Sequence, residues 1–320
     1  MIQKLFEHFP YLEVITRHAY KKLLEIGILK KRIVPNEKAE DVKKVDPIEL
    51  TYMLEDVGVK KGDVLIVHSS MKGIKGFGMS PQEVIDYLKS LVGTEGMLLM
   101  PTYPDYPSEN SKYIFNEKYN EIYEYDVEQS PAWTGLITNI FRKQEGVIRS
   151  SYPNNTLSAW GKDNSKPFLS EMETDLAYDR SSAWIYCVDN HAKVLFLGIH
   201  AHHSLSEIHI AEDYLDKDWP VTGWYTEKQY IIKNNGNTIE KTCRVRKNFW
   251  TKYMTEYYGC YRLRKKGVLI EGKIDNINYS IVPDLFEFEQ YVEECAQKGD
   301  LLYFRIPRKY KKDIKRERTV

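Results

Sequence analysis

Short runs of consecutive apolar residues alternate along the chain with segments whose apolar residues recur every three or four positions. Three such runs span residues 64–70, 97–100 and 193–199. Runs of this length are typical of strands buried on both faces of a sheet. Two other segments, 47–57 and 81–91, begin with an N-capping side chain followed by proline, which marks the start of a helix. Strand, helix and strand in this order predict an α/β fold with helices covering a sheet.

The remaining segments divide into further predicted helices, one hairpin and one long loop. Apolar spacing predicts helices over 11–29, 131–144, 209–215 and 285–297. The polar turn at 234–237 predicts a hairpin, with a turn longer than the simple two-residue type. Residues 103–130 are rich in proline, acidic and aromatic residues and are predicted to form a loop.

No internal repeat or low-complexity linker divides the chain, so we predict one domain with an appendage at each end. The domain is expected to span 46–306, after a helical N-terminal extension over 1–45 and before a basic C-terminal tail over 307–320. The N-terminal helix is predicted to dock on the body of the protein or on a second subunit, which leaves a homodimer open.

The overall charge excludes partners that are chosen by bulk charge. The 320 residues hold 46 basic and 46 acidic side chains, whereas general nucleic-acid binders carry a clear basic excess, so we expect no nucleic-acid partner. Four cysteines without a CxxC spacing are predicted to be buried thiols of a reducing compartment. The chain has no signal-like start and no window near the ~18 consecutive apolar residues of a membrane span, so we expect a cytoplasmic protein.

Small polar residues stand where two of the predicted strands end. His68, Ser69 and Ser70 close the first strand ahead of a glycine-containing loop, and Pro101 and Thr102 close the next. Ligands of α/β proteins bind at the carboxyl ends of strands, where amides and hydroxyls can reach a phosphate or a carbonyl oxygen. The segment matches neither a Walker loop nor a GxGxxG fingerprint, so a plain strand-to-loop turn explains it equally well.

A histidine-rich stretch, 199–212, holds the most specific candidate for catalysis. His209 and Glu212 are three residues apart and share one face of a helix, where the carboxylate can orient the imidazole as a general base. An ordinary surface contact has the same spacing. A metal site needs three or four converging ligands, and without HExxH or a cysteine partner we expect no metal. The polar loop 149–156 fits a substrate rim or a turn held by its own side chains.

Taken together and in this order, these segments resemble the aminoglycoside 3-N-acetyltransferase family. The similarity is clearest over residues 46–215 and includes the stretches VHSS (67–70), GTEGMLLMPT (93–102), RSSYPNNT (149–156) and HIAE (209–212). It implies a central mixed sheet flanked by helices, a fold unlike that of the commoner GNAT acetyltransferases. It further implies transfer of an acetyl group from acetyl-CoA to an amine of an aminoglycoside or related amino sugar.

The resemblance also assigns roles to residues by position. His209 corresponds to the family's histidine base and Glu212 to its supporting carboxylate. The residues that correspond to the CoA-binding parts are His68, Ser69, Ser70, Met71, Pro101, Thr102 and Thr156. The candidates for contact with the acceptor are Tyr103, Asp105 and Asp213. Tyr152 is the third catalytic candidate, because it stands where the family commonly has a histidine, although tyrosine is a poor base near neutral pH.

Two further regions bear on the acceptor. The acidic stretch 105–128 favours a cationic amino sugar if it lines the cleft, and is otherwise a solvated loop. An enlarged region, 213–260, contains Trp219, Trp224 and Trp250, which are either core residues or surfaces for stacking on sugars.

We therefore predict a cytoplasmic N-acyltransferase that uses acetyl-CoA, no metal, and a small-molecule amine as acceptor. Two alternatives stay open at this point. The acceptor could be an amino sugar of surface-polysaccharide biosynthesis instead of an antibiotic, or the chain could be an inactive family member that serves as a binding protein.

Overall fold

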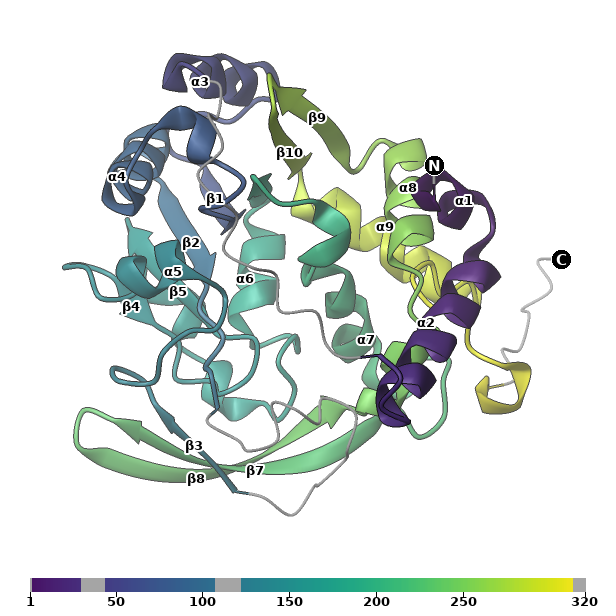
Figure 1. Cartoon of the computed structure of the whole chain (residues 1–320). Helices are drawn as coiled ribbons and strands as arrows, with labels where there is room; N and C mark the ends of the chain where they lie inside the picture. Colours follow the sequence, from purple (N-terminus) through teal and green to yellow (C-terminus); the bar gives the residue numbers. More distant parts are fainter. Residues whose placement is uncertain (1, 30–43, 107–121, 313–320) are drawn as a thin grey trace, which may run out of the picture.

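Seven strands form the central sheet, in the order β4-β5-β2-β1-β6-β10-β9 (Figure 1). The computed structural model describes residues 2–29, 44–106 and 122–312. The strands of this sheet are β1 (Val64–Ser69), β2 (Met97–Pro101), β4 (Ile148–Arg149), β5 (Leu157–Gly161), β6 (Lys193–Leu197), β9 (Ile270–Ile274) and β10 (Ile277–Val282). The inner strands β2, β1 and β6 run parallel, and the outer pairs are antiparallel. The predicted mixed α/β sheet is confirmed.

Helices cover both faces of this sheet. On one face, residues such as Leu65 and Val67 pack with α3 (Pro47–Asp56), α4 (Pro81–Val92) and α5 (Leu136–Phe141). On the other, residues such as Ile66 and Phe196 pack with α6 (Ala183–Asp189), α7 (Ile210–Leu215) and α9 (Leu285–Gln297) (Figure 1). Successive residues of a strand point to opposite faces, so a strand covered on both sides needs apolar residues at consecutive positions. This is the physical reason for the uninterrupted apolar runs in the sequence.

The predicted helix starts are confirmed by their capping contacts. The carboxylate of Asp46 accepts a hydrogen bond from the amide of Ile48 at the start of α3. At the start of α4, Ser80 and Glu83 bond each other's backbone amides in a capping box, which satisfies two donors that the first turn leaves unpaired. Helix α9 begins and ends at the predicted residues.

A second, three-stranded sheet contains β3 (Ile122–Asp126), β7 (Tyr225–Asn234) and β8 (Asn237–Arg246). The prediction of a loop over 103–130 is therefore wrong for β3, which pairs in parallel with β7 about a hundred residues away. The hairpin of β7 and β8 is confirmed, but its turn is the two-residue Asn235-Gly236, shorter than predicted. Both turn residues have positive φ, 48° and 78°, as the tight hairpin turn requires.

Helix α5 is shorter than the predicted 131–144. The residues ahead of it are held in an extended arrangement, because the amide of Asp105 donates to the carbonyl of Pro131 and that of Trp133 to the carbonyl of Tyr103. These bonds to a distant segment replace the first helical turn.

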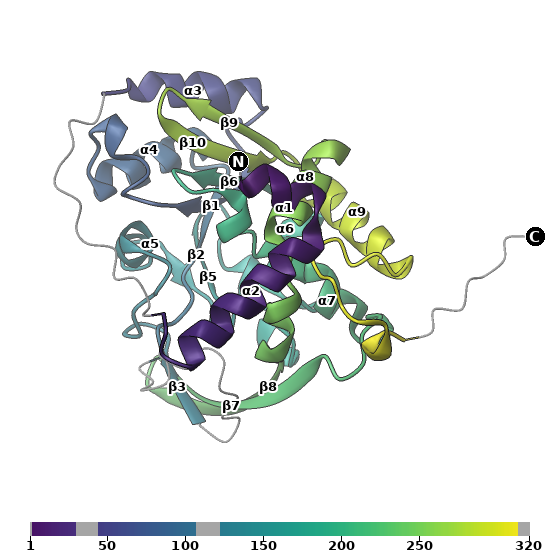
Figure 2. The same cartoon turned by 45° about the vertical axis from the view of Figure 1, so that its right-hand side comes forward.

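Two helices, α1 (Ile2–His8) and α2 (Pro10–Glu25), form the N-terminal segment and pack beside α8 (Glu256–Lys266) (Figure 2). Helix α2 docks through its charged side, since Arg17 bridges Glu13 (3.0 Å) and Glu256 (2.9 Å) and Glu13 is only 3% exposed. Its apolar residues Leu12 and Ile15 face outward. The basic residues at 30–32, the end of the basic tail and most charges of the acidic stretch 105–128 lie outside the described residues.

The three tryptophans of the enlarged region belong to the core. Trp219, Trp224 and Trp250 are all less than 5% exposed, and neighbouring ring centroids are 5.2 Å apart. No ring face is therefore open to a sugar, and the core interpretation is confirmed. The four cysteines are free and buried, as predicted. Across the described ranges, every helix is too short or too polar to cross a membrane.

Candidate active site

The carboxyl ends of the parallel strands β1, β2 and β6 meet at one edge of the sheet, which confirms the shared edge predicted for the first two. The loop after β1 closes onto the end of β6, where the amide of Ser70 donates to the carbonyl of Leu197 (3.1 Å). Gly73 lies directly against Gly198, and a Cβ at Gly73 would overlap the Gly198 carbonyl oxygen. Only glycine permits this close approach of two backbones.

His68, a predicted cofactor residue, is bound inside the protein. Its Nε2 is 2.8 Å from Oε1 of Glu207, which is fully buried in the short helix η6 (Glu207–His209), and its ring stacks on Phe196 at 4.7 Å. The pair holds the segment that carries His209 against the end of β1. Glu207 was not predicted as a functional residue, because 139 positions separate it from its partner.

Most of the other predicted cofactor residues already bond or pack against groups of the protein itself. Thr102 and Thr156 are at most 1% exposed, and their hydroxyls bond Ser158 and the carbonyl of Tyr152, so both hold strand ends together in this structure. The carbonyl of Pro101 accepts a hydrogen bond from Thr134. Met71 packs against the core of the α3 and α4 face. Ser69 differs from these, since its hydroxyl is buried without a hydrogen-bond partner in the described part of the chain.

The structure brings His209 and Glu212 together. Nδ1 of His209 lies 2.6 Å from Oε1 of Glu212, and Glu212 is 2% exposed. A carboxylate only accepts hydrogen bonds, so Nδ1 carries the proton and Nε2 keeps its lone pair. The second carboxylate oxygen accepts a hydrogen bond from Nε1 of Trp224 (3.0 Å). The buried tryptophan thus positions the carboxylate that orients the histidine.

Arg246 is a third member of this group that the sequence did not reveal. Its Nη1 lies 3.1 Å from Oε1 of Glu212, and 2.6 Å from Nδ1 and 3.1 Å from Nε2 of His209, so it is beside the imidazole ring. Burial lowers the pKa of His209, and the charge of Arg246 lowers it further against the opposing effect of Glu212. Burial alone would raise the pKa of Glu212, but Arg246 and His209 outweigh it and hold this pKa below its usual value. The arrangement favours a neutral imidazole beside an ionised carboxylate.

A pocket of about 170 Å³ opens at these residues. Its lining comes from the loop after β4, the loop ahead of α6, helix α7 and strand β8. The lining residues are Asn154, Asn155, Ala177, Tyr178, His209, Glu212, Asp213, Arg244, Val245 and Arg246. Of the predicted residues, the structure therefore gathers His209, Glu212 and Asp213 at one cavity.

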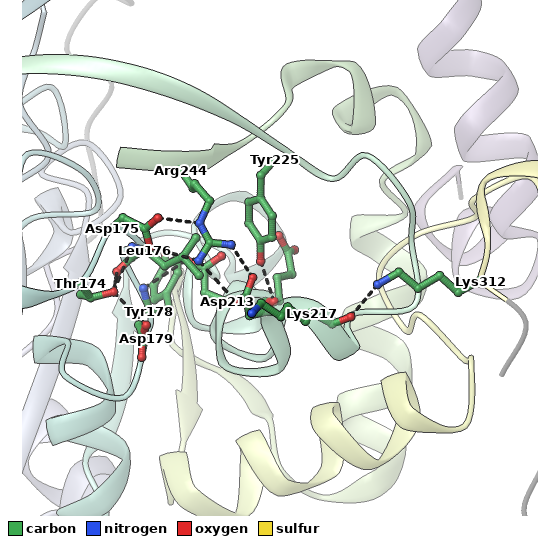
Figure 3. Close-up of polar contacts among 12 residues, drawn as sticks. Thr174, Asp175, Leu176, Tyr178, Asp179, Asp213, Lys217, Tyr225, Arg244 and Lys312 are labelled. Carbon is green, nitrogen blue, oxygen red and sulfur yellow. Dashed lines mark hydrogen bonds and ion pairs between the residues drawn. The ribbon is translucent and has the colours of Figure 1, made fainter. Parts of the chain in front are cut away.

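Asp213 and Arg244 also line this pocket, and Figure 3 shows the polar contacts around them. Asp213 accepts a hydrogen bond from the amide of Tyr178 (3.1 Å), and burial raises its pKa to about 8. Arg244 bonds Asp175 and Asp216, each at 2.6 Å. Asp213 is accordingly protonated at neutral pH, and Arg244 is neutralised by two carboxylates.

Tyr152 and Asp105 lie apart from the pocket lining. Tyr152 is 4% exposed, its hydroxyl has no hydrogen-bond partner in the described ranges, and Nζ of Lys241 lies 5.5 Å from its ring centroid. Asp105 is exposed, and Tyr103 packs near Trp133 with centroids 5.8 Å apart. None of the three lines the pocket that holds His209.

The polar loop 149–156 is held by its own side chains, and its last residues also reach the pocket lining. Arg149 donates to the carbonyl of Thr102 (2.6 Å), and Glu171 accepts from the hydroxyl of Ser150 and the amide of Ser151 (2.5 and 2.7 Å). The loop is thereby anchored to the sheet and to a buried carboxylate. Its far end supplies two asparagines to the pocket. Within the residues that the structure describes, no group of three histidine, cysteine or acidic side chains is arranged to hold a metal ion.

Comparisons with known proteins agree with this architecture. A family model described as aminoglycoside 3-N-acetyltransferase matches residues 66–290. The SPbeta prophage-derived aminoglycoside N(3')-acetyltransferase-like protein YokD of Bacillus subtilis (strain 168) is 30% identical over 127 residues, 37% of this chain and 47% of that protein. Aminoglycoside N(3)-acetyltransferase IX of Micromonospora chalcea is 24% identical over 158 residues, 47% of this chain and 55% of that protein. The chain thus spans about half the length of these curated relatives.

The fold is similar to solved structures over a larger share of the chain. The structure titled "AAC-IIIb binary with CoASH" has a TM-score of 0.67 and 18% identity, and the match covers 83% of this chain and 99% of that one. At this identity the likeness concerns the fold. The helices α1 and α2 precede the residues that the family model matches.

Proposed function

Because the chain belongs to the aminoglycoside 3-N-acetyltransferase family, we propose that it transfers the acetyl group of acetyl-CoA to an amine of an amino sugar or aminoglycoside-like substrate. The observation that carries this proposal is the contact of His209 with the buried Glu212 on the wall of the pocket. Acyl transfer to an amine needs a base, since an amine is largely protonated at neutral pH.

His209 takes the role of that base. Its Nε2 receives a proton from the acceptor amine while the nitrogen forms a bond to the acetyl carbon and the carbon–sulfur bond of the thioester breaks. The proton then passes from Nε2 to the departing thiolate, so the base is restored after each cycle. Glu212 holds the ring in the required tautomer and stabilises the imidazolium. The low pKa of His209 keeps its Nε2 free of a proton at neutral pH.

The edge of the sheet beside this pocket has a feature that suits the acyl donor. The hydroxyl of Ser69 is buried at the end of β1 without a partner in the described residues, so its capacity to bond an oxygen of the donor is unused. The amide of Ser70 is bonded to Leu197, which leaves hydroxyls and not this amide for the oxyanion. We assign Ser69 to the donor side of the reaction on this ground.

The two alternatives are affected differently by the geometry. An inactive binding protein has no need of a buried carboxylate, a tryptophan and an arginine arranged around one imidazole, so the arrangement supports catalysis. An amino sugar of surface-polysaccharide biosynthesis remains the second candidate acceptor, because Arg246, which shares the carboxylate of Glu212 with His209, would repel a polycation.

The test is release of CoA with a panel of amino sugars and aminoglycosides, together with acetyl-CoA binding measured by calorimetry. The proposal is refuted if no amine is acetylated and acetyl-CoA does not bind. His209→Ala should lower kcat by about 10²–10⁴, the usual contribution of a general base. His203→Ala is the matched control, since His203 is exposed in the same segment and outside the pocket. An undiminished rate for His209→Ala would reject the base assignment alone.

A further inference from the structure

Strand β8 contributes two arginines to the pocket lining, and they differ in how many carboxylates neutralise their charge. Arg244 and Arg246 are two positions apart and so point to the same side of the strand. Arg244 is held by Asp175 and Asp216. Within the described ranges, Arg246 is paired with one carboxylate, that of Glu212, which also bonds His209 and Trp224.

Arg246 lies beside the nitrogen of His209 that an acceptor amine must approach. Among the described residues, all hydrogen bonds of its guanidinium involve Nη1, and the partners are His209 and Glu212. Nη1 lies 2.6 Å from Nδ1 and 3.1 Å from Nε2 of His209, so it is beside the ring and close to the position from which an amine would deliver its proton to Nε2. A guanidinium and an ammonium this close together repel strongly in a partly buried pocket. Arg246 therefore has to turn aside when the acceptor binds.

Among the residues that the structure describes, the pocket lining offers no second anion to receive the displaced guanidinium. Glu212 stays with His209, and the carboxylates of Asp175 and Asp216 are bonded to Arg244. The remaining acidic residue, Asp213, is protonated at neutral pH because burial raises its pKa to about 8. Arg246 is 22% exposed, so its charge is partly desolvated and favours a bidentate anion.

We propose that the acceptor is an amino sugar that carries an anionic group, a phosphate ester or a carboxylate, beside its amine, and that Arg246 binds this group. The proposal rests on the N-acetyltransfer proposed above and names the acceptor class. The amine then lies against Glu212 and Nε2 of His209 while the anion holds the guanidinium away from the imidazole. A polycationic acceptor has no group to offer Arg246 and meets its charge directly.

The experiment compares four acceptors: glucosamine, glucosamine 6-phosphate, glucosaminuronic acid and the polycation tobramycin. The wild type should prefer the phosphate- or carboxylate-bearing sugar over glucosamine by about 10–100-fold in kcat/KM, the range of one charge-assisted hydrogen bond. Arg246→Gln should reduce this preference to about threefold or less, mainly through KM of the anionic sugar. Arg246→Glu should reverse it in favour of tobramycin. Comparing glucosamine 6-phosphate with glucosaminuronic acid shows whether Arg246 binds a phosphate or a carboxylate.

Equilibrium binding of each acceptor is measured in parallel, with CoA present. This measurement separates recognition of the acceptor by Arg246 from the proposed acetyl transfer. Selective binding of an anionic sugar that is lost in Arg246→Gln, without any CoA release, upholds the role of Arg246 and refutes the proposed acetyl transfer. Lys162→Gln is the control variant, because it removes an exposed cation that is paired with Glu95 away from the pocket. Thermal unfolding of each variant shows whether it is folded.

Three results would overturn the proposal. One is a wild type that binds and acetylates glucosamine or tobramycin as well as the anionic sugars. Another is an Arg246→Gln variant that keeps the wild-type preference. The third is an increase in KM for acetyl-CoA by the same factor with every acceptor, which would assign Arg246 to the phosphates of the acyl donor.

Discussion

Replacing Glu212 by glutamine tests the core of the proposed chemistry with almost no change in shape. The carboxylate accepts hydrogen bonds from Nδ1 of His209 (2.6 Å), Nε1 of Trp224 (3.0 Å) and Nη1 of Arg246 (3.1 Å). Glutamine keeps one acceptor oxygen and places an amide donor where the second oxygen was. At least one of the three donors then faces another donor, and Arg246 loses its counter-charge.

The expected loss follows from these contacts. A hydrogen bond to a charged partner is worth about 1.5–3 kcal/mol, and Glu212 supports both the tautomer of His209 and its imidazolium. Losing one to two such interactions in the transition state amounts to about 3–4 kcal/mol, or about 10²–10³ in kcat. Glu212 also opposes the burial and the Arg246 charge that lower the pKa of His209. Without its charge this pKa falls further, so the acid limb of the pH–rate profile moves to lower pH.

The assay is the initial rate of CoA thiol release between about pH 5 and pH 9, with acetyl-CoA saturating. Glu240→Gln is the matched control, since Glu240 is exposed on the same strand as Arg246 and should leave rate and profile unchanged. A Glu212→Gln variant that is folded, keeps kcat within about threefold and shows an unmoved acid limb would contradict the role of the carboxylate.

Three further changes test the packing and the charge around the site. Trp224→Ala should lower the free energy of unfolding in urea by about 3–5 kcal/mol, whereas Trp133→Ala, exposed by 65%, should cost little; equal losses would be inconsistent with a buried tryptophan core. Asp213 has a pKa of about 8 in the folded state and near ~4 in the unfolded chain. Between these pH values the unfolded chain has released this proton and the folded protein has not, so the free energy of unfolding falls as pH rises. Asp213→Asn should remove that part of the slope in urea unfolding at pH 5 and pH 8, and identical slopes would disprove the assignment. Gly73→Ala should destabilise by about 1–3 kcal/mol in the same assay because of the overlap with Gly198, and a change below about 0.5 kcal/mol would show that the loop can move away.

The parts of the site that the sequence predicts are those that depend on local spacing. His209 and Glu212 share a helical face because they are three residues apart, and that geometry survives in the fold. The strand ends at His68 and Thr102 meet at one edge because parallel strands align their carboxyl ends. What these residues bond is a different matter, since the partner of His68 is 139 positions away.

The enlarged region shows the same division. Its tryptophans and its hairpin could be recognised in the sequence. The sequence did not show that Trp224 and Arg246 both bond the carboxylate of Glu212. That depends on the pairing of β8 with β7 and on how this sheet lies against α7, which periodicity within one segment does not reveal.

The apolar runs, the helix caps and the histidine–carboxylate spacing can be read from the chain alone, because each arises from neighbouring residues and backbone geometry. Tertiary structure alone decided that 122–126 is a strand, that Thr102 and Thr156 are buried, and that an arginine lies against the imidazole. All three outcomes depend on contacts between segments that are far apart in the chain. For the arginine and the imidazole, the interaction becomes strong only because folding brings both groups together and partly removes them from water. The histidine–carboxylate pair at His209 therefore follows from local spacing, whereas the charge of Arg246 that an acceptor meets there depends on the tertiary fold.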